Sequence, residues 1–354
     1  MTSRAAGGAL GRRIASELGE LTVHKVREVG FRNAEENSAR IAGAQSILAL
    51  RETPLMEGDT AIIVAAGPSL HRTDAGRQIR EAGFRGTLIA TDSAMVYCLR
   101  AGLVPDLIVT LDPHPRRILR WFGDPDLTRE DLLQDDYFAR QEMEPTFADN
   151  QIEKNREVLA LVDRYGRSIR AATSSSVAPN VAKRIRDSGM IEYWWNPFYD
   201  DYDLPGSLTK QIHAMNGLPC LNAGGNVGSA AWVLAHALLD KKKIGIVGMD
   251  LSYYADTPYE RTQYYHELVH LVGRERLGEV FIPIRNPHLE ADFYTDPAYL
   301  WYRDSFLEMA QQADCETYNC TEGGILFGTG VQFAPLRYFL ENPAANACEK
   351  GRHG

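Results

Sequence analysis

The chain has 354 residues, 44% of them hydrophobic and 24% charged, with a formal net charge of −9 and no basic run longer than residues 241–243. This composition is typical of a globular protein of one large or two modest domains, and it argues against a nucleic-acid-binding protein, which needs a basic surface. The five cysteines form no CxxC pair, and the sequence has neither an apolar signal-peptide core nor a stretch of ~20 apolar residues. We therefore expect a cytoplasmic protein with reduced thiols and no integral membrane segment.

The first third of the chain predicts two helices followed by a parallel sheet. Apolar residues recur at helical spacing over residues 13–51, which indicates a helical extension at residues 1–55. Short apolar runs rich in β-branched residues then predict buried strands, with helices between them. In chain order these strands and helices are residues 60–65, 69–83, 87–91, 94–101 and 107–111. A β-α-β-α-β order of this length implies right-handed crossovers and parallel strands.

The remaining residues continue this alternation, with one acidic segment and one aromatic segment. Residues 116–160 begin with an acidic, irregular stretch, which we interpret as a lid or an insertion, and residues 253–302 predict an aromatic-rich subdomain. The other expected elements are strand-helix-strand within 168–193, a helix over 228–239, a strand over 244–248 and a helix over 301–313. The predicted fold class is α/β, a Rossmann-like, mostly parallel sheet with helices on both faces. Its nucleotide-binding domain spans residues 56–340, followed by a tail at 341–354.

A Gly-Pro-Ser turn, Gly67, Pro68 and Ser69, directly follows the first predicted strand and opens a helix. Backbone N–H groups at such a turn can bind an anionic phosphate. The spacing matches neither the GxGxxG pattern nor Walker A. The alternative is an ordinary β-α turn in which Ser69 is the helix N-cap.

Carboxylates follow three of the predicted strands. Asp92 with Ser93, Asp112 with His114, and Asp250 each stand where a strand ends. Ligands of open α/β sheets bind outside the carboxyl ends of the strands, so we expect these groups to line one nucleotide site. The alternative is that each aspartate only caps a helix.

The loop at residues 222–228 has three glycines and two asparagines ahead of an Ala-rich helix. Asn222 and Asn226 can donate to and accept from a base or a ribose, and Gly225 and Gly228 permit close approach of a ligand. The alternative is a plain loop before a helix. We expect Gly67, Asp112, Asn226 and Asp250 to meet in one cavity.

Residues 266–270 fit the HExxH pattern, in which His266 and His270 would bind Zn²⁺ and Glu267 would act as base. A third ligand would be Glu279 or Glu290, but the flanking residues carry no further zincin signature. We therefore disfavour a zinc hydrolase.

The chain resembles the MptE-like family, which includes 6-hydroxymethylpterin diphosphokinases and the central domain of Maf flagellin glycosyltransferases. The matching stretches are residues 62–70 (IIVAAGPSL), 101–115 (AGLVPDLIVTLDPHP), 222–250 and 319–324 (NCTEGG), within about 32–340. The turn GPSL and the sequence GMDLSYY at 248–254 also resemble family 42 sialyltransferases, which use CMP-activated sugars.

The resemblance implies roles for individual residues. Gly67, Pro68 and Ser69 would line the nucleotide phosphate and ribose. Asn226, Val227 and Gly228 would lie against CMP, although Asn226 replaces the usual small hydroxyl residue. Asp250 would hold the cytosine or ribose side, and Tyr253 or Tyr254 would contact the donor phosphate. The catalytic base would be one of the histidines that follow: His266, His270 or His288.

Two activities follow from the resemblance. The favoured one is a glycosyltransferase that moves a nonulosonic-acid-type sugar from CMP to a protein or glycan acceptor. The alternative is a diphosphokinase that uses ATP and Mg²⁺, with the metal held by Asp92, Asp112 or Asp250. The sequence assigns no cofactor to the glycosyltransferase, and it specifies neither the acceptor nor the oligomeric state.

Overall fold

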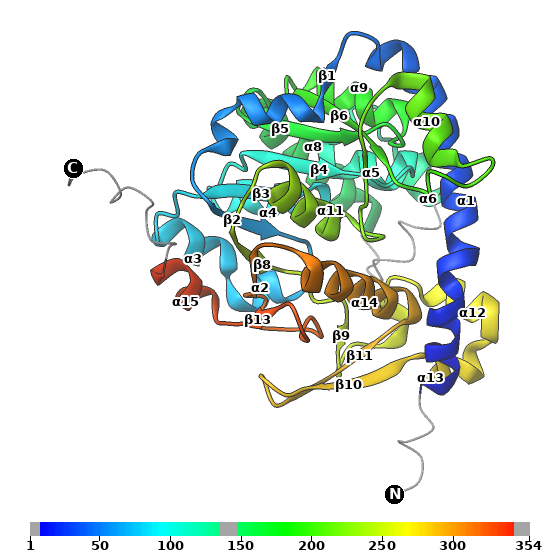
Figure 1. The fold of residues 1–354 in the computed structure, drawn as a ribbon. Coiled ribbons are helices and arrows are strands. Elements are labelled where there is room, and N and C mark those ends of the chain that lie inside the picture. The colour runs from blue at the N-terminus through cyan, green and yellow to red at the C-terminus, as the bar shows by residue number, and fades with distance from the viewer. Residues whose placement is uncertain (1–7, 135–146, 343–354) are drawn as a thin grey trace, which may run out of the picture.

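The computed structural model describes residues 8–134 and 147–342 (Figure 1). Its centre is a parallel sheet in the order β1-β6-β5-β4-β3-β2-β8-β12-β13, with β7 paired to β6. Its strands are β1 (Gln45–Ser46), β2 (Thr60–Val64), β3 (Thr87–Thr91), β4 (Leu107–Thr110), β5 (Arg170–Ser174), β6 (Ile191–Pro197), β7 (Cys220–Leu221), β8 (Lys243–Val247), β12 (Glu316–Asn319) and β13 (Gln332–Phe333). The parallel α/β fold predicted from the sequence is confirmed.

Helices cover both faces of the sheet, and the strands divide their side chains between two cores. Ile63 faces one hydrophobic cluster, which includes Trp232 and Phe306, whereas Ile62 and Val64 face the other. This alternation follows from the two-residue period of a strand. The flanking helices are α3 (Ala75–Glu81), α4 (Asp92–Arg100), α5 (Pro115–Phe122), α8 (Phe147–Tyr165), α9 (Pro179–Asp187), α11 (Val227–Val233), α14 (Pro297–Gln312) and α15 (Leu336–Glu341). Burial on both faces explains why the strands read as continuous apolar runs.

The order of the strands reverses between β2 and β8. From β2 the chain adds β3, β4, β5 and β6 on one side, and it then returns to place β8 on the other side of β2. Val64 of β2 lies in register with Val247 of β8, so the carboxyl ends of these two strands are neighbours. Open α/β sheets bind their ligands at such a switch point.

The N-terminal extension is one helix, α1 (Ala9–Ile41), and the prediction of two helices was wrong. Helix α1 runs along the side of the molecule (Figure 1), where it packs against α9, α10 (Leu208–Asn216), α13 (Leu277–Val280) and α14. Buried amides hold its second half: Asn37 Nδ2 donates to the carbonyls of Ser175 (3.1 Å) and Val177 (2.8 Å). The second half of α1 is thus held by polar contacts with a loop that is distant in the sequence, and not by the apolar periodicity on which the prediction relied.

We expect Asn37→Ala to lower the free energy of unfolding by about 1–3 kcal/mol, because two buried carbonyls would lose their donor. Urea denaturation measures the change. Asn180→Ala is the control, since Asn180 is exposed and its amide makes a 3.3 Å bond to Pro115 O. Equal stability of the two variants would contradict a structural role for Asn37.

Two other predicted helices are interrupted. The helix expected over 69–83 is divided into α2 (Ser69–Thr73) and α3 by Asp74, whose φ is 52°. The helix expected over 228–239 consists of α11 and a π-helical turn, Leu234–Leu238.

The C-terminal part adds a small antiparallel sheet. Its strands are β10 (Ile282–Asn286), β11 (Ala291–Thr295) and β9 (Tyr253–Tyr254), and α12 (Tyr265–Val272) and α13 pack beside it. Tyr253, Phe281 and Tyr294 form its aromatic core, in agreement with the predicted aromatic-rich subdomain.

The acidic segment contains α5, α6 (Arg129–Gln134) and α8, and residues 135–146 lie outside the described part of the chain. The lid or insertion interpretation therefore stays a prediction, as does the tail, of which residues 343–354 are not described. Among the described helices, none combines the length and apolar character that crossing a membrane requires.

Candidate functional site at the switch point

The Gly-Pro-Ser turn after β2 and Asp250 after β8 are in direct contact. Gly67 N–H donates to the carbonyl of Gly248 (2.7 Å), and Ser69 Oγ donates to Asp250 Oδ2 (2.7 Å). A Cβ on Gly67 would overlap Asp250 Oδ2 and lie 2.8 Å from its Cγ. Gly67 is therefore required for the approach of the turn to Asp250, and not only for the approach of a ligand. Pro68, between Gly67 and Ser69, is exposed.

Asp250 is buried, with 2% of its surface exposed, and one of its oxygens lacks a partner. Among the described residues no hydrogen-bond donor reaches Asp250 Oδ1. Gly323 lies close beside this oxygen, because a Cβ added to Gly323 would be 3.0 Å from Oδ1 and 2.8 Å from the Tyr254 hydroxyl. Burial raises the pKa of Asp250 to about 6, although the hydrogen bonds from Ser69 oppose this rise. An unsatisfied buried acceptor costs stability, and such groups are commonly found where a protein binds a ligand.

Arg72 supplies positive charge beside Asp250. Its guanidinium carbon lies 3.6 Å from the centre of the Tyr254 ring, and its positive charge lowers the pKa of Asp250. Its side chain remains 53% exposed beside Asp256 (3.8 Å). An exposed guanidinium at this edge can bind phosphate oxygens. The sequence reasoning missed Arg72, and its only signal there was its position three residues after Ser69.

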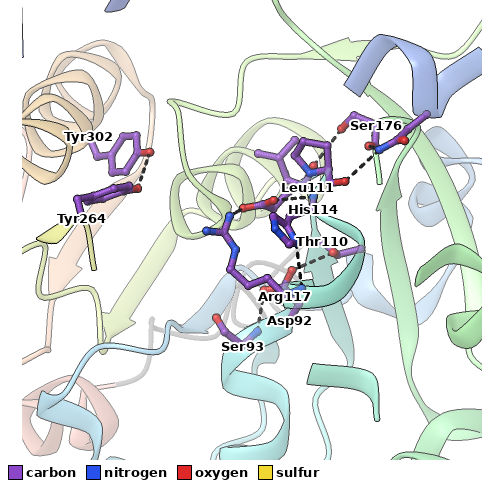
Figure 2. A network of polar contacts seen from close by, with 12 residues as sticks. Asp92, Ser93, Thr110, Leu111, His114, Arg117, Ser176, Tyr264 and Tyr302 are labelled. Carbon is purple, nitrogen blue, oxygen red and sulfur yellow. Dashed lines mark hydrogen bonds and ion pairs between the residues drawn. The ribbon is translucent and has the colours of Figure 1, made fainter. Parts of the chain in front are cut away.

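A second buried carboxylate, Asp92, lies between the ends of β3 and β4 (Figure 2). Its Oδ1 accepts from Ser93 N–H (2.7 Å) and its Oδ2 from Thr110 Oγ (2.8 Å). Burial raises the pKa of Asp92 to about 6, and the hydrogen bonds and the charge of Arg117 oppose this effect. Both oxygens of Asp92 thus have donors within the protein.

Asp112 and His114 organise the turn that leads into α5. Asp112 forms an ion pair with Arg117 and accepts from His114 N–H (2.9 Å). His114 Nδ1 accepts from Arg117 N–H (3.1 Å) and caps α5, and a contact of His114 with the nucleotide stays a prediction. Asn33 of α1 supports the turn by donating to the carbonyl of Pro113 (3.1 Å).

The loop at residues 222–228 lies at the same edge of the sheet as Gly67. The position of a Cβ on Gly228 is 3.2 Å from Met249 Sδ and 3.8 Å from Ala65 Cβ. Asn226 caps α11: its Oδ1 accepts from Ser229 N–H (3.0 Å), and its Nδ2 donates to Ser229 Oγ (2.8 Å). Its amide is thus used within the protein.

The other half of this loop is shaped by its own backbone and by α14. Asn222 Oδ1 accepts from Gly224 N–H (3.0 Å). The next residue, Gly225, is exposed and lies against α14. A Cβ on Gly225 would overlap the Trp301 ring and lie 2.9 Å from Tyr302 Cδ1. The close approach that the glycine permits is therefore one to protein side chains.

Tyr253 lies inside the aromatic core. Its hydroxyl donates to Asp296 Oδ2 (2.7 Å) and accepts from Gln263 N–H (3.0 Å). Burial and then the charge of Asp296 raise its pKa well above the ordinary value. Both contacts of the hydroxyl are thus with the protein itself, and the catalytic role of Tyr253 stays a prediction.

The candidate histidines lie on two separate elements. His266 is half-buried beside Tyr265 on α12, His270 is exposed on the same helix, and the His288 ring stacks on Phe333 (4.7 Å) beyond β10. Within residues 8–134 and 147–342, no group of three or more His, Cys, Asp or Glu side chains is arranged to hold a metal ion. For the HExxH motif, Glu279 pairs instead with Arg276 and Glu290 is exposed.

Three buried carboxyls, those of Asp92, Asp250 and Asp296, have a pKa raised by burial to about 6. The native state binds protons more tightly than the unfolded chain, so the contribution of these groups to stability falls as the pH rises from about 4 to about 6. Each group accounts for a loss on the order of 2–3 kcal/mol in the free energy of unfolding between pH 4.5 and pH 7. We expect Asp296→Asn to remove the share of Asp296 from this loss, as measured by urea denaturation at the two pH values. The control Asp314→Asn, at a fully exposed side chain, should keep the wild-type difference. An unchanged pH dependence in Asp296→Asn would contradict the raised pKa.

Comparison with known proteins confirms the family resemblance for part of the chain. Residues 32–121 match the family model described as 6-hydroxymethylpterin diphosphokinase MptE-like, and this segment holds Gly67, Ser69, Asp92 and Asp112. A solved Maf glycosyltransferase from Magnetospirillum magneticum AMB-1 is similar at 15% identity and a TM-score of 0.46, over 79% of this chain. The alignment covers 34% of that protein, so the chain spans about a third of its length. No curated protein matches the chain.

Proposed function

We propose that the protein is a nucleotide-dependent transferase whose nucleotide binds at the β2–β8 switch point. The observation that carries this proposal is Asp250 Oδ1, a buried acceptor without a donor at the edge where such sheets bind ligands. A ribose hydroxyl or a base amino group would supply the missing donor. Arg72 would neutralise a phosphate of the nucleotide beside Asp250. Tyr254, whose ring stacks under the Arg72 guanidinium, would line the same site.

We further propose that the donor is a CMP-activated nonulosonic-acid-type sugar and the acceptor a hydroxyl of a protein or glycan. In this reaction the bond between the sugar carbon and the phosphate oxygen breaks, CMP leaves, and the acceptor oxygen bonds to the sugar carbon. A histidine, His266 or His288, would take the acceptor proton, and His270 is the third candidate. Orientation of the donor and stabilisation of the leaving phosphate would supply most of the rate enhancement. We place this reaction in the cytoplasm.

The second candidate is a diphosphokinase, favoured by the description of the family model that matches residues 32–121. It would transfer diphosphate from ATP to a pterin hydroxymethyl group, with Mg²⁺ on the phosphates. Of the three carboxylates that would hold the metal, Asp92 and Asp112 already accept hydrogen bonds or pair with Arg117, whereas Asp250 keeps one oxygen without a partner. Asp250 would therefore be the principal carboxylate ligand of Mg²⁺ in a diphosphokinase.

A thermal-shift screen of CMP, CDP, UDP, ATP and pterin, each with Mg²⁺ and with EDTA, separates these activities, because a ligand of the native state raises Tm. We expect CMP to raise Tm equally with Mg²⁺ and with EDTA. Stabilisation by ATP only when Mg²⁺ is present would instead support the diphosphokinase. Incubation with a CMP-sugar and release of CMP then tests turnover directly.

A further inference from the structure

One buried amide joins two loops of the candidate site. Asn286, at the end of β10, has 0% of its surface exposed, and both ends of its side-chain amide are in use. Its Oδ1 accepts from the N–H groups of His288 (2.9 Å) and Leu289 (3.2 Å), in the turn between β10 and β11. Its Nδ2 donates to the carbonyl of Gly324 (2.8 Å), in the loop that follows β12. Asn286 therefore connects the turn of a candidate base to a loop of the main sheet.

The loop that accepts from Asn286 lies directly against Asp250. A Cβ on Gly324, whose φ is 69°, would overlap the carbonyl oxygen of Asp250, so only a glycine permits this approach. Ile325 N–H donates to the same carbonyl (2.9 Å). The backbone from which the Asp250 carboxylate extends is thus fixed by residues 324–325, and Asn286 fixes those residues in turn.

The residue after Asp250 is held in a strained conformation by the neighbouring strand. Leu251 has a φ of 50°, in the left-handed region that bulky side chains rarely adopt. The hydroxyl of Thr295, a buried residue at the end of β11, donates to the carbonyl of Leu251 (2.8 Å). Such a conformation persists only where surrounding contacts impose it, and it is often found at functional sites. The small antiparallel sheet thus holds the Asp250 loop at two points, through Thr295 directly and through Asn286 by way of residue 324.

We propose that Asn286 is a positioning residue that keeps the turn of His288 and the loop of Asp250 in one fixed arrangement. This rests on the proposed function, in which Asp250 binds the nucleotide and a histidine takes the acceptor proton. A base must stay in register with the donor, because a misplacement of about 1 Å lowers the rate on the order of 100-fold. The link favours His288 as that base, since the other two candidate histidines lie on a separate helix, α12. The His288 ring is also fixed, by its stacking on Phe333 (4.7 Å).

Hydrogen–deuterium exchange of the ligand-free protein tests the link itself. We expect Asn286→Ala to accelerate exchange at residues 287–290 and at residues 249–254 together, roughly 10-fold relative to the control, because both segments lose the support of the amide. The control is Asn37→Ala, which removes another buried amide that donates to two carbonyls. Acceleration of one segment without the other, or the same change in the control, would contradict the link.

A second variant, Asn286→Asp, separates the two contacts of the amide. It keeps the acceptor for the turn of His288 and replaces the donor to Gly324 by an oxygen. We expect faster exchange at residues 249–254 and 323–325, with wild-type exchange at residues 287–290. Unchanged exchange at residues 249–254 would show that the bond to Gly324 does not hold the Asp250 loop.

Calorimetric titration of CMP and the rate of CMP release from CMP-N-acetylneuraminic acid measure the consequence for the reaction. We expect Asn286→Ala to bind CMP roughly 10-fold more weakly and to lower kcat by a further factor on the order of 10–100, because the base is displaced as well. Thr295→Val frees the Leu251 carbonyl but leaves the turn of His288 in place, so it should weaken CMP binding with a smaller change in kcat. Wild-type CMP affinity and kcat in Asn286→Ala would overturn the positioning role. If the wild-type protein does not bind CMP, the proposed function fails, and the exchange experiment still decides the link.

Discussion

Replacing Asp250 by asparagine is expected to abolish nucleotide binding while leaving the protein at least as stable as wild type. The asparagine can still accept from Ser69 Oγ, but its Nδ2 would then present a donor where the wild-type Oδ1 presents an acceptor. A donor of the nucleotide would meet another donor, and a fall in affinity of at least roughly 100-fold follows from the unpaired groups. Removing a buried carboxylate should also relieve a cost of about 1–3 kcal/mol.

Calorimetric titration with CMP and urea denaturation measure these two effects. The control is Asp314→Asn, which removes an equal charge from a 98% exposed side chain and should change neither. Loss of stability in Asp250→Asn together with retained CMP affinity would show that Asp250 is only a structural residue.

Gly67→Ala is expected to destroy binding and to destabilise the fold. From the sequence pattern alone, a β-branched residue at Gly67 is expected to block a ligand and to leave much of the fold intact. The structure places Asp250 Oδ2 and the carbonyl of Gly248 where a Cβ would lie, so even a methyl group must separate the turn from β8. Overpacking of this kind costs about 1–3 kcal/mol or more.

Urea denaturation and CMP titration of Gly67→Ala should therefore show lower stability and no measurable binding. Gly278→Ala is the matched control, because no atom lies within 4 Å of its Cβ position and its φ is not positive. If Gly67→Ala were as stable as Gly278→Ala and bound CMP normally, the contact between the turn and Asp250 would be of no consequence.

The long inner strands of the central sheet were predictable from the sequence, whereas the strands β1, β7, β12 and β13 and the continuity of the long helix were not. Strand β2 is an uninterrupted apolar run because both of its faces are buried, and this signal is local. The continuity of α1 depends on Asn33 and Asn37, whose partners lie 80 to 143 residues away along the chain. Periodicity of apolar residues carries no information about such contacts.

The candidate site was also predictable only in part. Gly67, Ser69 and Asp250 were nominated because strand ends and turns are visible in the sequence, and the structure brings them into contact. Arg72 was missed, because its position beside Asp250 and Tyr254 depends on tertiary packing.

The nominations also included residues whose polar groups are used within the protein. Asn226 and His114 cap helices, and the hydroxyl of Tyr253 binds Asp296. The residue type alone does not distinguish a cap or a core contact from a ligand contact. Their proposed contacts with the nucleotide stay predictions.

Hydrogen–deuterium exchange with and without CMP tests the location of the nucleotide most directly. Binding at the switch point predicts added protection of backbone amides at residues 65–72, 248–254 and 321–324, the segments around Asp250. A different cavity, of about 360 Å³, lies among Asp163 of α8, Arg167 just after α8, and Arg184 of α9. Protection confined to that cavity, with none around Asp250, would contradict the assignment of the nucleotide to the β2–β8 edge.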